Sequence, residues 1–245
     1  MIYGARPSPF VAEVPDLLGL IGTSAPPADV SLVAYVDRIR NQRQSSKCVG
    51  ESLAAALHIA GKAQGLHASP RGIWTGARVR ERLRSTDILV NTGCAFADAI
   101  DGCMRMGVRP EDELDDDDAA TNDEDALDEL EKCVQLPREA FASIAGVDAA
   151  LGTRAALLHG WPVSFATMVD QSFEDYDGTA GAWDGIKGPV LGGHAMVVVG
   201  AYSSGDFLIC NSWGVNFGFG GFARFTESAL RQCFDVYAVR QGANL

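Results

Sequence analysis

Four residues of this chain have the side chains of an acyl-transfer site: Cys48, His194, Asn211 and Gln42. Cys48 would lie in the first turn of a helix, where the exposed N–H groups and the helix dipole favour a thiolate. His194 is expected on an apolar strand and could take the thiol proton. These residue types therefore predict a thiol nucleophile with an imidazole base.

Two further residues would complete the reaction centre. The amide oxygen of Asn211 would accept a hydrogen bond from one ring nitrogen of His194, and the other nitrogen would face the sulfur. Trp213 could cover that hydrogen bond. The side-chain amide of Gln42, six residues before Cys48, could donate with the Cys48 N–H to a developing oxyanion. Gln44 is an alternative that spacing alone leaves open.

Taken singly, each signal has a common structural explanation. An isolated cysteine is usually a small buried apolar residue, and an Asn-Ser-Trp-Gly sequence is usually a turn. Gly192 and Gly193 before His194 would let a substrate backbone approach, and Ala195 leaves room beside it. The remaining histidines are poorer candidates. His58 is ten residues along the helix of Cys48, about 15 Å away by helical rise, and His67 and His159 have no reactive neighbour in the sequence.

The residues around these positions predict helices first and strands later, which is typical of an α+β fold. Residues 1–27 are expected to form an irregular arm with a short turn at 17–21, and 30–39 a short extended segment. Ser45 and Ser46 would cap the Cys48 helix. The other predicted helices are 73–84, one through Phe96, Ile100 and Met104, a weak one at Leu127 and Leu130, and 149–159; the predicted strands are 163–169, 194–202, 207–211, 221–226 and 235–240.

Composition narrows the function classes. The net charge of −12 argues against nucleic acid as a partner. The acidic run at 111–131 is predicted to be a solvated loop, because its carboxylates lack the spacing and glycine of a calcium loop. No apolar stretch predicts a membrane span or a secretion signal. Six scattered cysteines without a C-x-x-C pair predict no metal site, no cofactor and a reducing, cytoplasmic location.

Three blocks resemble the papain-like cysteine peptidases, specifically a compact bacterial and phage-type branch. Residues 41–48 (NQRQSSKC) are similar to the family's NQGxCGSC block, which selects Gln42 over Gln44. Residues 193–200 (GHAMVVVG) are similar to its His-containing strand, and 211–224 (NSWGVNFGFGGFAR) to its NSWG block. The order Cys, His, Asn also agrees, with partners roughly 130–150 residues downstream, although Asn211 lies slightly further.

The resemblance implies two lobes with the active site in the cleft between them. A helical lobe (28–135) would carry the nucleophile, an antiparallel β-barrel lobe (136–245) His194 and Asn211, and 1–27 would be the arm. It implies peptide hydrolysis through a thioester, with Gly93 pairing with the substrate backbone beside Gly192, Gly193, Ala195 and Trp213. The sequence departs from the family at Ser45, Val49 and Phe217, and its arm is much shorter than the family's inhibitory prosegment, which disfavours control by prosegment cleavage.

Two alternatives remain at this stage. The same site could carry out transpeptidation, or hydrolyse an isopeptide or a small amide. The chain could also be a binding or virion component that keeps the fold without turnover. The sequence predicts a peptide or protein substrate and does not indicate the oligomeric state.

Overall fold

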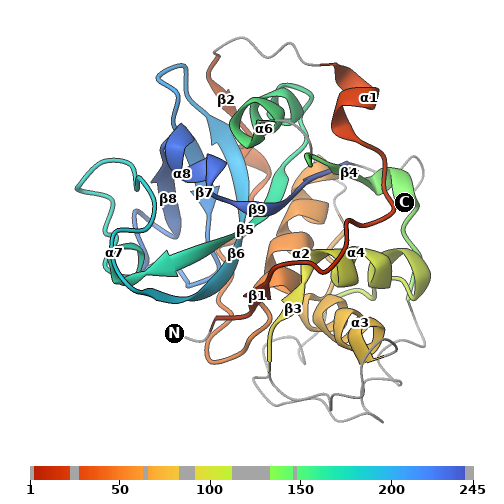
Figure 1. Cartoon of the computed structure of the whole chain (residues 1–245). Helices are drawn as coiled ribbons and strands as arrows, with labels where there is room; N and C mark the ends of the chain where they lie inside the picture. The colour runs from red at the N-terminus through yellow and green to blue at the C-terminus, as the bar shows by residue number, and fades with distance from the viewer. Residues whose placement is uncertain are drawn as a thin grey trace.

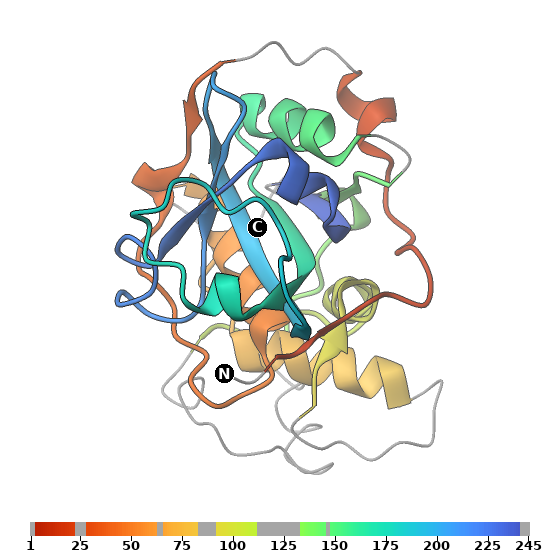
Figure 2. The ribbon, with the colours of Figure 1, turned by 60° about the vertical axis from the view of Figure 1, so that its left-hand side comes forward.

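The computed structural model describes residues 3–22, 28–62, 66–82, 92–111, 133–145 and 148–240. Helices α2 (Cys48–Ala60), α3 (Pro70–Arg82) and α4 (Phe96–Arg105) lie on one side of the molecule and a sheet lies on the other (Figure 1). Helix α2 lies between the two parts, as the second view also shows (Figure 2). The arrangement is α+β with two lobes, as the sequence predicts.

The helical lobe contains α2 (Cys48–Ala60), α3 (Pro70–Arg82) and α4 (Phe96–Arg105). The bounds of α2 agree with the prediction, and the helix ends at Gly61. Helix α3 begins before the predicted residue 73, at Pro70, and proline suits a first helical turn because its missing N–H would have no helical partner there. The weak helix predicted at Leu127 and Leu130, like most of the acidic run, lies outside the described residues.

Helices α3 and α4 pack closely because glycines meet at their contact. A Cβ on Gly102 would lie 3.0 Å from the backbone of Gly76. Helix α2 approaches the start of α3 in the same way, since a Cβ on Gly50 would lie 2.1 Å from the Pro70 oxygen. Close approach of this kind fixes the position of α2, and with it the position of Cys48.

The second lobe is built on antiparallel strands in the order β4-β9-β5-β6-β7-β8, with β2 beside one end of β6. The strands are β2 (Val30–Ser31), β4 (Phe141–Ser143), β5 (Val163–Asp170), β6 (Val190–Ala201), β7 (Phe207–Cys210), β8 (Phe222–Phe225) and β9 (Phe234–Val239). The helices and turns of this lobe are α6 (Ala149–Leu158), α7 (Gln171–Glu174), α8 (Glu227–Arg231) and the 3₁₀ turn η4 (Arg138–Ala140). The long strand β6 pairs with β5 and β7, which places His194 inside the sheet.

Hydrogen bonds join α2 to this sheet. The Ser52 hydroxyl donates to the Met196 carbonyl at 2.7 Å, and the Ser164 hydroxyl donates to the Ser52 carbonyl at 3.4 Å. All three residues are buried. The helix that begins with Cys48 is therefore fixed directly on the strand that carries His194.

Three local predictions were wrong. Residues 30–39 are not one extended segment: β2 is followed by a 3₁₀ turn, η1 (Val33–Tyr35), and the Ser31 hydroxyl accepts from the Val33 N–H at that turn. Ser45 and Ser46 do not cap α2, because the N-cap residue is Lys47 and it makes no side-chain cap bond. The arm is also more regular than expected.

The arm contains a strand and a helix. Strand β1 (Ala5–Arg6) pairs in parallel with β3 (Cys94–Ala95), at the start of α4. Helix α1 (Leu17–Ile21) is capped by the Asp16 carboxylate. In Figure 1, β1 crosses in front of α2 between the sheet and the helical lobe. Among the described residues, no helix is long and apolar enough to cross a bilayer.

Candidate active site

The Cys48 thiol is fully buried at the start of α2. Its sulfur accepts backbone hydrogen bonds from Ala195 on β6, from Gly4 in the arm and from Val49 in its own helix. Burial raises the pKa of the Cys48 thiol to about 11, and these three bonds only partly oppose it. The helix start was expected to lower this pKa, but desolvation dominates here, so the thiol is protonated and unreactive at neutral pH.

His194 is held by the Asn211 side chain. Its Nε2 lies 2.7 Å from the Asn211 Oδ1, which also accepts from the Ser212 N–H at 2.7 Å. An amide oxygen only accepts hydrogen bonds, so Nε2 carries the ring proton and Nδ1 keeps a lone pair. Nδ1 is buried and has no hydrogen-bond partner within the described structure. The tautomer is thus that of a base.

Trp213 covers this histidine–asparagine pair. Its ring stacks on the imidazole with centroids 4.5 Å apart and planes inclined by 25°. Trp213, His194 and Asn211 are all buried. Burial lowers the pKa of His194 to about 4, although the hydrogen bond to Asn211 acts in the opposite direction. The imidazole is neutral in this state, like the thiol.

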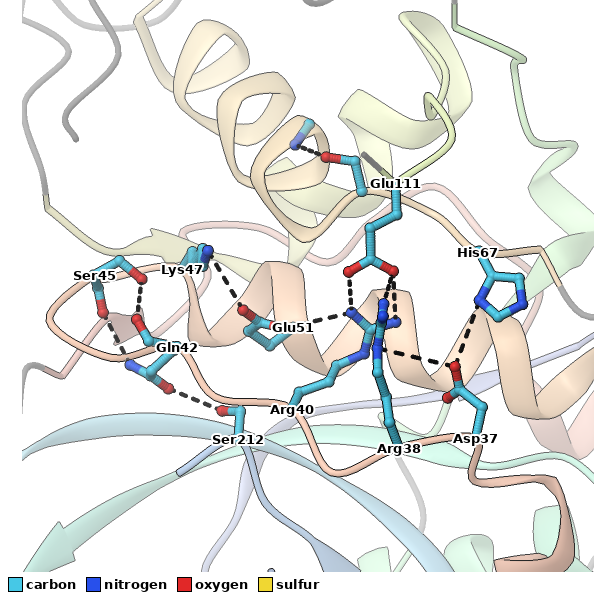
Figure 3. A network of polar contacts seen from close by, with 12 residues as sticks. Asp37, Arg38, Arg40, Gln42, Ser45, Lys47, Glu51, His67, Glu111 and Ser212 are labelled. Carbon is cyan, nitrogen blue, oxygen red and sulfur yellow. Dashed lines mark hydrogen bonds and ion pairs between the residues drawn. The ribbon is translucent and has the colours of Figure 1, made fainter. Parts of the chain in front are cut away.

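Gln42 contacts Ser212, the residue that follows Asn211. Its Oε1 accepts from the Ser212 hydroxyl at 2.9 Å, its Nε2 donates to the Ser45 carbonyl at 3.0 Å, and its backbone N–H donates to the Ser212 carbonyl at 2.9 Å (Figure 3). Gln42 is buried, whereas Gln44 is exposed. Of the two glutamines that the sequence left open, Gln42 is therefore the one beside Asn211.

The arm occupies the positions predicted to bind a substrate backbone. A Cβ on Gly93 would lie 1.6 Å from the Gly4 carbonyl oxygen, and one on Gly193 would lie 2.0 Å from the Ala5 carbonyl oxygen. A Cβ on Gly192 would likewise lie 2.5 Å from the Cβ of Tyr3.

Tyr3 also meets Trp213, with ring centroids 6.4 Å apart. All five residues predicted to contact substrate thus lie beside the arm or, in the case of Ala195, beside the thiol that the arm covers.

The orientation of Gly4 prevents Cys48 from attacking the peptide group that covers it. Its N–H points to the Cys48 sulfur, while its carbonyl points to Gly93. A thiolate attacks a carbonyl carbon, so this orientation presents the wrong end of the peptide group. Cys48 belongs to the buried apolar core, and the backbone of the arm covers its sulfur on the side of Gly4. A backbone segment of this kind can be displaced.

A buried charge network, which the sequence analysis did not detect, supports the loop before α2. Glu51 in the first turn of α2 lies 3.7 Å from both the Lys47 ammonium and the Arg40 guanidinium, and Arg40 also pairs with Glu111 at 3.0 Å. Figure 3 shows these four side chains joined by dashed lines, from Lys47 through Glu51 and Arg40 to Glu111. Arg40, Lys47 and Glu51 are at most 6% exposed. The signal in the sequence was an acidic residue in a first helical turn.

Replacing Glu51 with alanine should destabilise the fold by about 3 kcal/mol, because it leaves two buried cations without this carboxylate. Urea denaturation would measure the change. Arg231→Ala is the control: Arg231 also forms an ion pair with a residue four positions away, Glu227, but its side chain is 48% exposed. That control should change stability by less than about 1 kcal/mol. Equal effects would contradict a buried network.

Stability should fall in mild acid because of His194. Its pKa of about 4 in the folded state lies below the ordinary 6.5, so the unfolded chain takes up the proton first as pH falls. The free energy of unfolding should drop by about 2–3 kcal/mol between pH 7 and 4.5 on this account. Urea denaturation at both values would measure it. The drop should shrink in His194→Gln and persist in His159→Gln, and an unchanged drop in His194→Gln would contradict the assignment.

The architecture is the papain-like fold, and the solved structures similar to it include several cysteine proteases. Xylellain, a cysteine protease from Xylella fastidiosa, has a TM-score of 0.69 and 18% identity, covering 98% of this chain and 96% of its own. Digestive procathepsin L2 from Tenebrio molitor has a TM-score of 0.72 and 18% identity, covering 98% and 78%.

A Carica candamarcensis cysteine protease in complex with E-64 has a TM-score of 0.66 and 18% identity, covering 89% of this chain and 100% of its own. No protein-family model matches the chain, and a search of curated proteins finds no match. The similarity therefore lies in the fold, and the argument for activity depends on the site.

Proposed function

We propose that this protein is a cysteine-type peptidase that hydrolyses peptide bonds through a Cys48 thioester. One observation carries the proposal: Asn211 orients the imidazole of His194 as a base. The next residue along β6, Ala195, donates its backbone N–H to the Cys48 sulfur, so the base and the nucleophile belong to neighbouring positions. The ring nitrogens of a buried histidine with only a structural role normally have hydrogen-bond partners, whereas His194 Nδ1 has none within the described structure. The similar fold of known cysteine proteases supports the same function.

The proposed reaction begins when Cys48 attacks a peptide carbonyl and His194 Nδ1 takes the thiol proton. The resulting oxyanion would be met by the Gln42 amide and the Cys48 N–H. His194 then gives its proton to the leaving amine, and the C–N bond breaks. Water attacks the thioester, assisted by His194, and releases the acid and the thiol.

The substrate class follows from the arm. Residues 3–6 contact the cleft mainly through backbone, and β1 pairs with β3 by main-chain hydrogen bonds. A cleft that accepts one extended backbone in this manner would accept another, so the proposed substrate is an extended segment of peptide or unfolded protein. The protein as described is a latent form, because the arm and the substrate would compete for the same glycines.

We also infer that the protein works in a reducing compartment. None of its six cysteines, all of which lie among the described residues, forms a disulfide bond. A cytoplasmic location agrees with this chemistry, since reducing conditions keep thiols reduced.

The proposal is tested by hydrolysis of a casein-type unfolded protein, using a variant with the arm displaced. Gly4→Ala serves for this, because a Cβ on Gly4 would lie 2.0 Å from the Ser46 carbonyl oxygen. Cleavage by Gly4→Ala, and none by Gly4→Ala with Cys48→Ala, is the expected result. A Cys48 that reacts with alkylating reagents yet cleaves nothing would instead favour a silent binding component, and products joined to an added amine would favour transpeptidation.

A further inference from the structure

Three side chains with metal-ligating atoms meet away from the active site: Asp37, His58 and His67. They come from the segment after η1, from the second half of α2 and from the loop before α3. Their ligand atoms all lie within 4.8 Å of one another. His58 is ten residues along α2 from Cys48, which is about 15 Å by helical rise. This cluster is therefore separate from the reaction centre.

The distances within the cluster exceed those of hydrogen bonds. Asp37 Oδ1 lies 3.9 Å from His58 Nε2, and Asp37 Oδ2 lies 3.5 Å from His67 Nδ1. A hydrogen bond between such atoms is normally about 2.7–3.2 Å. Ligand atoms around one tetrahedral zinc ion, at bonds of about 2.0–2.2 Å, lie roughly 3.3–3.6 Å apart. The observed separations need only small side-chain shifts to surround an ion.

The two imidazoles are also placed as a pair. Their ring centroids are 4.2 Å apart with planes inclined by 39°. Imidazoles bind metal ions through their ring nitrogens, so this proximity lets both rings reach one ion. His58 is buried on α2 and His67 is exposed, so one ligand is rigid and the other is reachable from solvent.

We propose that Asp37, His58 and His67 bind a divalent transition-metal ion of the zinc class. Two imidazole nitrogens and one carboxylate suit zinc and its neighbours, whereas calcium and magnesium prefer oxygen ligands alone. Three protein ligands leave a fourth position for water. The ion would tie α2 to the segment that leads into Gln42 and to the loop before α3.

The charged neighbours of the cluster leave Asp37 able to ligate. The Arg38 guanidinium approaches Asp37 Oδ2 only at 4.0 Å, and its other end pairs with Glu111. Arg40 is also paired with Glu111. Figure 3 shows Asp37 at the end of this network, between Arg38 and His67. Because Arg38 is half exposed, it can turn away when an ion arrives.

The test uses the full-length protein without a polyhistidine tag, titrated with Zn²⁺ by calorimetry and with Co²⁺ by absorption spectroscopy. The expected results are one saturable Zn²⁺ site and a melting temperature that rises by about 3–5 °C per tenfold excess over Kd. Co²⁺ should give visible bands without the thiolate charge-transfer band that cysteine ligands produce. His67→Ala and Asp37→Asn should each weaken binding at least about tenfold.

The matched control is His159→Ala, since His159 is likewise exposed and lies in a turn. It should leave Zn²⁺ affinity and the Co²⁺ spectrum unchanged. The proposal is overturned by the absence of a saturable site, by a thiolate band, or by affinity that survives both His67→Ala and Asp37→Asn. Because both of these residues are exposed, the two variants should fold, and circular dichroism would verify this.

Discussion

Replacing Gly4 with alanine is expected to raise the rate of Cys48 alkylation at neutral pH by about a hundredfold. The added Cβ would lie 2.0 Å from the Ser46 carbonyl oxygen, which belongs to backbone that α2 holds in place. The arm must then leave the thiol. Its pKa should fall from about 11 toward the ordinary value near 8.5 or below, which increases the thiolate fraction by about two orders of magnitude. Iodoacetamide labelling followed by peptide mass analysis would measure the rate at Cys48.

The control for this prediction is Gly19→Ala. Gly19 lies in the same arm, and a Cβ there would meet no atom within 4 Å. The labelling rate of this variant should equal that of the unchanged protein. A folded Gly4→Ala variant whose Cys48 remains as slow as the control would show that the arm is not what protects the thiol.

Removing His194 in the Gly4→Ala protein is expected to lower kcat/KM for peptide hydrolysis by about 10²–10⁴-fold. A general base in the transition state contributes an effect of this size. His194 can act as this base because its Nδ1 keeps a lone pair, since Nε2 donates its proton to the hydrogen bond with Asn211. Initial rates on a fluorogenic peptide would measure the loss.

His159→Ala in the same background is the comparison. His159 contacts Trp161 with ring centroids 5.2 Å apart and planes inclined by 33°, and it is exposed. Its loss should change the rate by less than about twofold, as is usual for a surface change away from the site. Activity that survives His194→Ala, with Cys48 still required, would remove His194 from the mechanism.

The parts of the fold that local pattern determines were predictable. Helix α2 begins and ends as expected, because an apolar run meets Gly61, and the apolar and aromatic runs after Pro162 form the strands β5 to β9. The expected hydrogen bond between His194 and Asn211 is also present. Helices and strands were predictable because their apolar residues recur every 3.6 or 2 positions along a short stretch of sequence.

Contacts between distant segments were not predictable in the same way. The arm was expected to be irregular, because nothing in residues 3–6 indicates a partner at Cys94. The pKa of Cys48 was expected to be low, because the helix start is local and the covering Gly4 is not. His58 was set aside for its distance from Cys48 along the helix and His67 for lack of a reactive neighbour in sequence, whereas the fold brings Asp37 close to both.

The helix cap shows a third kind of limit. Ser45 and Ser46 are good cap residues by type, yet the cap falls at Lys47. The Ser45 hydroxyl instead donates to the Gln42 carbonyl at 2.6 Å. The turn that holds Gln42 against Ser212 therefore determines where α2 begins, and propensity yields to this tertiary contact.

The most direct measurement is the alkylation rate of Cys48 against pH in Gly4→Ala, with and without His194→Ala. An uncovered sulfur paired with the imidazole should remain reactive at mildly acidic pH, where an isolated thiol is protonated, and that acidic reactivity should vanish with the histidine. If both proteins show one and the same rise near the pKa of an ordinary thiol, the two side chains do not act together and no peptidase operates here.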